Sequence, residues 1–200
     1  MAATIPQVYA SSRLASVLCT PSVLDIAIHG CEERLLERTR PIECARLNAE
    51  SYADDKVSRF IAANFVPVRA HLNELPSWFH RFEVSWTPKV LITDSGTAER
   101  RRIEGDLPKA EFLAELHFRL ARLAFKQKKW SDSETKYGEI AEHYPDSAVA
   151  PEAQYWTGVS QHQRTHDPAI LTQTGKRLAE IYPASIWTKG ISVGRLNEIA

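Results

Sequence analysis

The sequence predicts an α/β fold, a mixed β-sheet flanked by helices, followed by an all-α tail of paired helices. Two observations predict it. From about residue 20 to residue 108, short apolar runs typical of strands alternate with segments of helical periodicity. Beyond residue 109 the strand signals end and alanine-rich helical periods take over. We therefore divide the 200 residues into an N-terminal segment without a recognisable pattern (1–19), an α/β domain (20–108) and a helical extension (109–200).

The first half of the α/β domain is predicted to be strand, helix, strand. Residues 23–28 form an apolar run that indicates a buried strand. Residues 46–63 carry apolar side chains at a helical period, with a break at residues 53–55. Residues 65–72 follow as a second strand, in which Pro67 is expected where no backbone donor is needed by the sheet.

The second half of this domain is predicted to be helix, hairpin, helix. Residues 76–82 indicate a short amphipathic helix. Residues 90–93 and 101–103 flank Asp94-Ser95-Gly96-Thr97, which is a favourable turn sequence, so we expect 90–93 to pair antiparallel with 99–103. Pro108 then opens a long helix over residues 109–126.

The helical extension contains an internal repeat. His143-Tyr144-Pro145-Asp146-Ser147 recurs 38 residues later as Ile181-Tyr182-Pro183-Ala184-Ser185. A period of this length is typical of stacked helix pairs, of which about one and a half units are expected. We expect helices through residues 110–197, two of them closed by the Tyr-Pro pairs. The side chains expected to be mostly buried between them are Leu120, Phe125, Trp130, Tyr137 and Trp156.

Charge and composition exclude several classes of function. Lys plus Arg equals Asp plus Glu at 25 each, so no net charge attracts nucleic acid or a membrane surface. The run at residues 126–129 is expected to be a solvated helix end. No segment has the ~20 apolar residues that span a bilayer, and no signal peptide is apparent. An odd count of three cysteines argues against a secreted disulfide framework, so we expect a cytoplasmic, bacterial-type protein.

The cysteines are the candidate chemical groups. Cys31 follows the first predicted strand and Cys44 lies thirteen positions later, so residues 32–41 separate Cys31 from Ile42-Glu43-Cys44. A nucleophilic thiolate needs a lowered pKa, which a helix N-terminus provides. Residues from Glu32 onward can form such a helix. If this helix continued, it would carry Cys44 away from Cys31, but Pro41 interrupts the helix.

Two stretches of sequence are similar to a known family. Cys44-Ala45-Arg46-Leu47, with Glu50 to Asp54 after it, resembles thioredoxin-like proteins that carry a Cys-x-x-Cys…Glu-Thr-Tyr-x-Asp pattern. Phe82 to Pro88, then Ile103-Glu104-Gly105, continues the resemblance to the end of that domain. The C-terminal third resembles tetratricopeptide-like helices. The resemblance covers roughly residues 42–190 and is most specific over residues 44–108.

The resemblance implies roles for individual residues. In such proteins the first cysteine attacks, the second resolves the mixed disulfide, and a cis Thr-Pro peptide faces the pair. Cys44 then corresponds to the resolving cysteine, and Trp86, Thr87 and Pro88 to the substrate-binding loop. Cys31 corresponds to the nucleophile if residues 32–41 are an insertion, which the six-residue spacing from Asp25 supports.

An alignment without the insertion puts Pro41 at the nucleophile position and leaves Cys44 alone. Three functions therefore stay open. One is a thiol-disulfide oxidoreductase that acts on a protein disulfide without a bound cofactor. The second is an inactive thioredoxin-fold scaffold whose helical tail binds a protein partner. The third is a redox sensor that uses Cys44 alone. The distance between Cys31 and Cys44 discriminates between them.

Other residue types give weaker signals. The five tryptophans (Trp78, Trp86, Trp130, Trp156 and Trp187) are expected to be packing residues. Cys19 lies in the segment that matches no pattern. His162 and His166 are four apart on one predicted helix, a spacing that allows them to share a face, but no third ligand accompanies them, so we expect no metal site. A glycine-rich phosphate loop and a Gly-x-Ser-x-Gly motif are both missing from the sequence.

Overall fold

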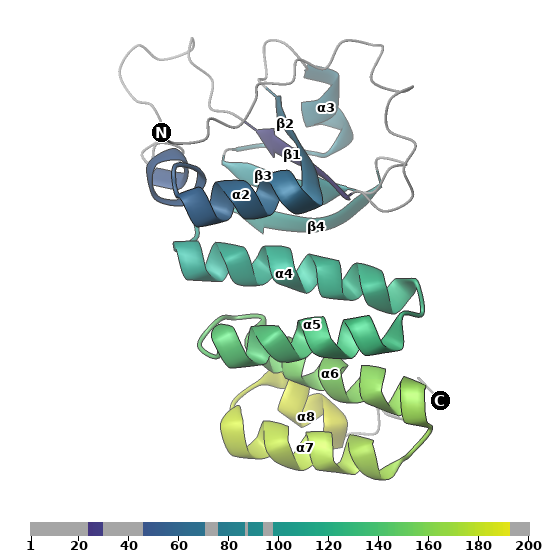
Figure 1. Cartoon of the computed structure of the whole chain (residues 1–200). Coiled ribbons are helices and arrows are strands. Elements are labelled where there is room, and N and C mark those ends of the chain that lie inside the picture. Colours follow the sequence, from purple (N-terminus) through teal and green to yellow (C-terminus); the bar gives the residue numbers. More distant parts are fainter. Residues whose placement is uncertain (1–23, 30–45, 71–75, 87, 94–97, 193–200) are drawn as a thin grey trace. The chain divides into compact units, whose positions relative to one another are not determined.

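The structure is a computed structural model that describes residues 24–29, 46–70, 76–86, 88–93 and 98–192. The chain separates into two compact units, Met1–Lys109 and Ala110–Ala200. We describe each unit by itself. The first contains a mixed α/β arrangement and the second contains helices (Figure 1).

The first unit is built on a four-stranded sheet. Its strands are β1 (Leu24–His29), β2 (Phe65–Ala70), β3 (Lys89–Thr93) and β4 (Glu99–Glu104). They lie in the order β2-β1-β3-β4, with β1 parallel to β2 and antiparallel to β3. Strands β3 and β4 pair antiparallel with Lys89 opposite Glu104 and Val90 opposite Ile103, which confirms the predicted hairpin pairing.

Between β1 and β2, the described residues 46–64 contain two helical segments. A π-helical turn, η2 (Leu47–Tyr52), is followed by α2 (Asp55–Asn64), so the predicted helix breaks where the sequence indicates. Asp54 caps α2 because its Oδ1 accepts hydrogen bonds from the backbone N–H groups of Lys56 at 3.0 Å and Val57 at 3.2 Å. A parallel strand pair requires such a crossover, and α2 provides it.

Helix α3 (Pro76–Arg81) lies between β2 and β3 in the chain. Strand β3 is buried along its whole length, and its Val90, Leu91 and Ile92 are fully inaccessible to solvent. A strand buried on both faces reads as a continuous apolar run, which is how residues 90–92 appear in the sequence. Phe82, which follows α3, packs on Leu91.

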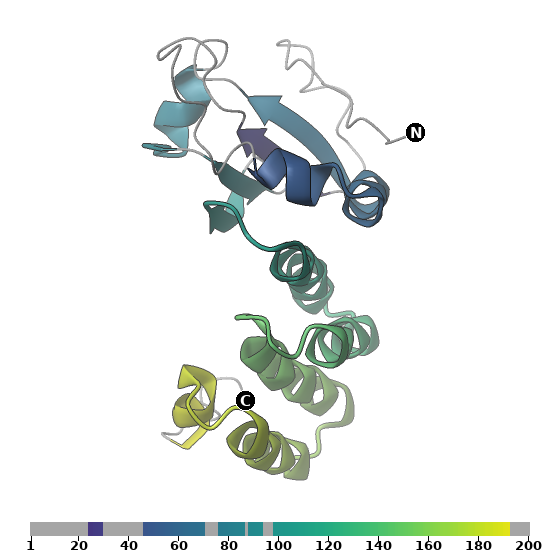
Figure 2. The same ribbon diagram turned by 90° about the vertical axis from the view of Figure 1, so that its left-hand side faces the viewer.

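The second unit consists of helices in succession. They are α4 (Lys109–Lys126, which begins in the last residue of the first unit), α5 (Trp130–His143), α6 (Ala150–Thr165), α7 (Ala169–Ile181) and α8 (Ile186–Ser192). Neighbouring helices α4 to α7 lie side by side in a stack (Figures 1 and 2). The predicted helical extension is thus confirmed through residue 192.

The Tyr-Pro pairs close helices as predicted. Helix α5 ends at His143 with Tyr144 as its C-cap, and α7 ends at Ile181 with Tyr182 as its C-cap. The described helices α4 to α8 include both Tyr-Pro turns, and the number of repeat units stays a prediction.

Aromatic side chains fill the interior of the second unit. Tyr137 is fully buried, and its ring meets the ring of Phe118 edge-on at 5.2 Å between centroids. The other side chains predicted to be buried (Leu120, Phe125, Trp130 and Trp156) are half-buried. The prediction holds fully for Tyr137 and in part for these four.

In the part of the chain that the structure describes, no helix has both the length and the apolar character needed to cross a lipid bilayer.

Candidate functional site

The end of β1 and the start of β3 lie at the same edge of the sheet. Ile28 in β1 pairs with Val90 in β3, and the two strands run in opposite directions. The chain therefore leaves β1 where Pro88 leads into β3. Pro88 is buried, and its carbonyl oxygen accepts a hydrogen bond from the backbone N–H of Gly105 at 2.9 Å. This edge is the candidate site.

Trp86 lies beside Pro88 in the chain and is exposed, with 45% of its surface accessible. The expectation that Trp86 packs in the interior is wrong. The residue precedes β3 in an irregular connection, so the alternation of the strand does not turn its ring inward. The ring lies instead near Lys89, whose Nζ is 5.4 Å from the ring centroid.

Gly105 lies close to the ring of Trp86. Its φ of 79° lies in the left-handed region, which favours glycine. A Cβ at this position would lie 3.8 Å from Cη2 of Trp86, an ordinary contact distance. The backbone conformation, and not the available space, is therefore what favours glycine at position 105.

Lys89, the first residue of β3, carries a buried charge. Only 4% of its side chain is accessible, and its Nζ lies 3.0 Å from Oε1 of Glu104. Lys89 and Glu104 are opposite each other in the β3-β4 ladder, so the ion pair joins the two strands across the hairpin. A lysine this deeply buried needs such a partner. The sequence analysis did not predict this ion pair. The signal that could have revealed it is the pair of opposite charges at positions that face each other in the predicted hairpin.

The segment that follows Cys44 in the chain is held by ion pairs. Arg46 Nε lies 3.1 Å from Oδ2 of Asp106 and 3.5 Å from Oε1 of Glu50. Lys109 Nζ lies 2.8 Å from Oδ2 of Asp54. This hydrogen bond is the largest cause that holds the pKa of Asp54 below its ordinary value, and the helix-start N–H groups add to it. These contacts fix η2 and the start of α2 to the segment after β4.

The predicted reactive residues lie outside the described residues. These are Cys31 and Cys44, together with Thr87 of the predicted binding loop and Cys19. The distance between the two cysteines and the expected cis peptide at Pro88 both stay predictions. The structure does bring together Trp86 and Pro88, and it adds Lys89, Glu104 and Gly105 to the same edge.

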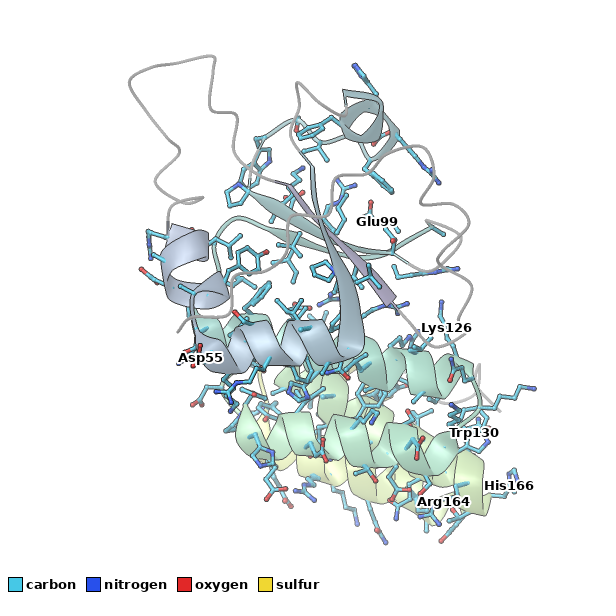
Figure 3. All side chains as sticks on the ribbon, turned by 45° about the horizontal axis from the view of Figure 1, so that its top comes forward. Asp55, Glu99, Lys126, Trp130, Arg164 and His166 are labelled. Carbon is cyan, nitrogen blue, oxygen red and sulfur yellow. The ribbon has the colours of Figure 1, made fainter. Side chains whose placement is uncertain are left out.

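His162 lies within α6, and His166 lies just beyond the end of this helix. Helix α6 ends at Thr165, and His166 adopts a left-handed φ of 58° as the C-cap. The prediction that both histidines lie on one helix is therefore wrong, because the helix ends between them (Figure 3 labels His166 at this end). Among the described residues, no three His, Asp or Glu side chains gather as a metal site would require.

The comparisons with known proteins find matches among solved structures. No protein-family model matches the chain. None of the curated proteins matches it either. Among solved structures, the chain is similar to a thioredoxin from Thermus thermophilus, with 26% sequence identity and a TM-score of 0.40, over 47% of this chain and 71% of that one.

Proposed function

We propose that this chain is a thioredoxin-like protein that performs thiol-disulfide exchange on a protein disulfide, with Cys31 as nucleophile and Cys44 as resolving cysteine. The observation that carries the proposal is the strand order β2-β1-β3-β4, with a parallel β1-β2 pair and an antiparallel β3-β4 hairpin. This order brings the end of β1 beside the residue that leads into β3. The thioredoxin resemblance stated for residues 44–108 agrees with it.

The position of Cys31 in the chain supports this role. Cys31 is two residues beyond the end of β1 at His29, and β1 pairs with the strand that Pro88 opens. A thiol on this stretch and a substrate on the Pro88 loop would meet at one sheet edge. The exposed ring of Trp86 offers an apolar contact to the substrate chain at the same edge.

The proposed chemistry needs no bound cofactor. The Cys31 thiolate attacks one sulfur of the substrate disulfide, a mixed disulfide forms, and the other substrate sulfur leaves as a thiolate. The Cys44 thiolate then attacks Cys31 Sγ, which forms the Cys31–Cys44 disulfide and releases the second substrate thiol. An external dithiol supplies the two electrons that reduce this disulfide again. The step requires residues 32–41 to return the chain so that the two Cα atoms lie within roughly 4.4–6.8 Å.

Three variants, each with one cysteine replaced by serine, test the proposal. The assay is reduction of a disulfide-bonded reporter protein with dithiothreitol as electron donor. We expect Cys31→Ser to show only the background rate, Cys44→Ser to accumulate a mixed disulfide detectable by intact mass, and Cys19→Ser to match the wild type as the control. Equal rates in all four proteins would refute the exchange reaction.

A second candidate is a scaffold whose helical unit binds a protein partner. The specific observation is the stacking of two helix pairs, in which Tyr182 Oη donates a hydrogen bond to the carbonyl oxygen of Pro145 at 3.0 Å. Stacked helix pairs present extended surfaces to peptides and partner helices. Equal reporter reduction by all cysteine variants would favour this candidate. A single adduct on Cys44 in the wild type, which is lost in Cys44→Ser and kept in Cys31→Ser, would favour a one-cysteine sensor.

A further inference from the structure

The junction of helices α4, α5 and α6 holds an arginine against aromatic rings. The Arg122 Cζ atom lies 4.0 Å from the centroid of the Trp156 ring and 5.7 Å from that of Phe125. These two rings meet edge-on at 4.9 Å, and Tyr137 stacks on Trp156 at 6.5 Å. A guanidinium over a tryptophan face is held by attraction to the ring, and its N–H edges are left for hydrogen bonds.

Two donors in this cluster have no acceptor. Within the described residues, Nη1 of Arg122 and Oη of Tyr137 are shielded from solvent and make no hydrogen bond. The Tyr137 side chain is fully buried. Nearly all buried polar groups in proteins are paired, so a buried donor without an acceptor points to a ligand or an ordered water.

The charges around Tyr137 favour an anion. Burial raises the pKa of Tyr137, so its hydroxyl keeps its proton and can donate. The Arg122 and Arg119 guanidinium groups oppose this rise, and Glu152 adds to it. Arg122 is thus close enough to act on Tyr137, although no well-aligned hydrogen bond joins them. One oxygen of Glu152, Oε1, already accepts the Trp156 Nε1–H at 3.3 Å.

We propose that Arg122 and Tyr137 form a binding site for a carboxylate group, supplied by an acidic peptide or by a small organic acid. A carboxylate has two oxygens that accept from a guanidinium and a hydroxyl together. Arg122 is half-buried whereas Tyr137 is fully buried, so a ligand reaches the Tyr137 hydroxyl only when the Arg122 side chain moves aside. The half-buried rings of Phe125 and Trp156 offer apolar surface to the carbon chain of the ligand.

The site is independent of the proposed thiol chemistry because it shares no residue with the Pro88 edge. Binding is therefore measured on the full chain carrying Cys31→Ser as well as on the wild type. The same affinity in both is expected, so failure of the exchange reaction and failure of the carboxylate site give different results.

The experiment compares matched probes by isothermal titration calorimetry. The probes are acetate, the peptide acetyl-Ala-Glu-Ala-amide and its neutral counterpart acetyl-Ala-Gln-Ala-amide. We expect saturable binding of the glutamate peptide, and none of the glutamine peptide. Acetate binding as tightly as the glutamate peptide would identify a small acid as the ligand, whereas weaker acetate binding would identify a peptide.

Variants assign the binding to the cluster. Arg122→Gln and Tyr137→Phe are each expected to weaken the binding by about tenfold or more. The control is Arg177→Gln on α7, an exposed arginine, which should leave the affinity unchanged. If Arg122→Gln fails to fold, Arg122→Lys keeps the charge but loses the planar fork, and it too should bind more weakly. Equal binding of the two peptides, or an unchanged affinity in the folded variants, would overturn the proposal.

Discussion

The hydroxyl of Tyr182 donates a hydrogen bond to the carbonyl oxygen of Pro145, at 3.0 Å, and so connects the two copies of the Tyr-Pro turn. Each turn also repeats its own backbone bond, since Ser147 N–H donates to the Tyr144 carbonyl and Ser185 N–H to the Tyr182 carbonyl, both at 3.0 Å. The repeat in the sequence is therefore a repeat in hydrogen bonding, and Tyr182 links one copy to the other.

Removing this hydroxyl should weaken the helical unit. Tyr182→Phe keeps the ring and loses the bond to Pro145, so we expect a loss of about 0.5–1.5 kcal/mol in the free energy of unfolding. Urea denaturation followed by circular dichroism measures it. Tyr144→Phe is the matched control, because the Tyr144 hydroxyl makes no hydrogen bond to a described residue, and its effect should be smaller. A larger loss for Tyr144→Phe than for Tyr182→Phe would contradict the link.

Two glycines should respond to alanine in opposite directions. A Cβ on Gly158 of α6 would lie 2.7 Å from Cβ of Thr174 on α7, so Gly158→Ala pushes these helices apart and should cost about 1–3 kcal/mol. Gly138 of α5 has no atom within 4 Å of the position of its missing Cβ. Gly138→Ala should therefore stabilise the chain by about 0.4–1 kcal/mol, because alanine favours a helix. Thermal unfolding of both variants checks the pair, and equal shifts would contradict it.

A buried serine pair should show strong coupling. Ser133 Oγ on α5 lies 2.9 Å from Ser160 Oγ on α6 and donates to the carbonyl oxygen of Ala121 on α4 at 3.4 Å. Both serines are fully buried, so Ser133→Ala leaves the Ser160 hydroxyl without this partner and should cost about 1–3 kcal/mol.

The double variant Ser133→Ala/Ser160→Ala removes both hydroxyls together. We expect it to be more stable than the sum of the single losses predicts, by about 0.5 kcal/mol or more. The measurement is a double-mutant cycle in urea. Strict additivity would show that the two hydroxyls do not interact.

The Asp54 cap should make the stability of the first unit depend on pH. Lys109 and the N–H groups at the start of α2 lower the pKa of Asp54 in the folded chain. The unfolded chain then takes up a proton at higher pH than the folded chain. The contribution of this charge is complete above the unfolded pKa and is lost as pH falls through the folded pKa.

The variant Asp54→Asn tests this dependence. It keeps a capping side chain but removes the charge, so it should be less stable than the wild type at neutral pH and equal to it at acid pH. Asp55→Asn is the control, since its carboxylate is exposed and lies 3.7 Å from Arg59. Urea unfolding measured across the pH range tests the prediction. It would be contradicted if the free energy of unfolding of Asp54→Asn stayed below that of the wild type at acid pH.

Local signals account for what the sequence predicts well. The β3-β4 hairpin is predicted because its turn residues lie between two strand-like runs, and the ends of α5 and α7 because tyrosine followed by proline stops a helix. The exposure of Trp86 is not predicted, since tryptophan is usually a packing residue and only the path of the chain before β3 leaves it uncovered.

Contacts between distant segments explain what sequence reasoning misses. Arg122, Tyr137 and Trp156 come from three helices, and no spacing in the sequence indicates that their side chains meet. Lys89 and Glu104 become neighbours only through the register of the hairpin. The sequence therefore predicts the residues around Pro88 as part of the candidate site, and it does not predict the Lys89–Glu104 ion pair.

The central place of β1 has a consequence for the order of assembly. In the described sheet, β2 and β3 are each hydrogen-bonded to β1 and not to each other. The six residues of β1 must therefore find partners at residues 65–70 and again at residues 90–93, far along the chain. Helices α5, α6 and α7 meet their neighbours in sequence, and local contacts form fast whereas distant strand pairing is slow. In refolding, helix signals from the second unit should appear before the sheet of the first is complete.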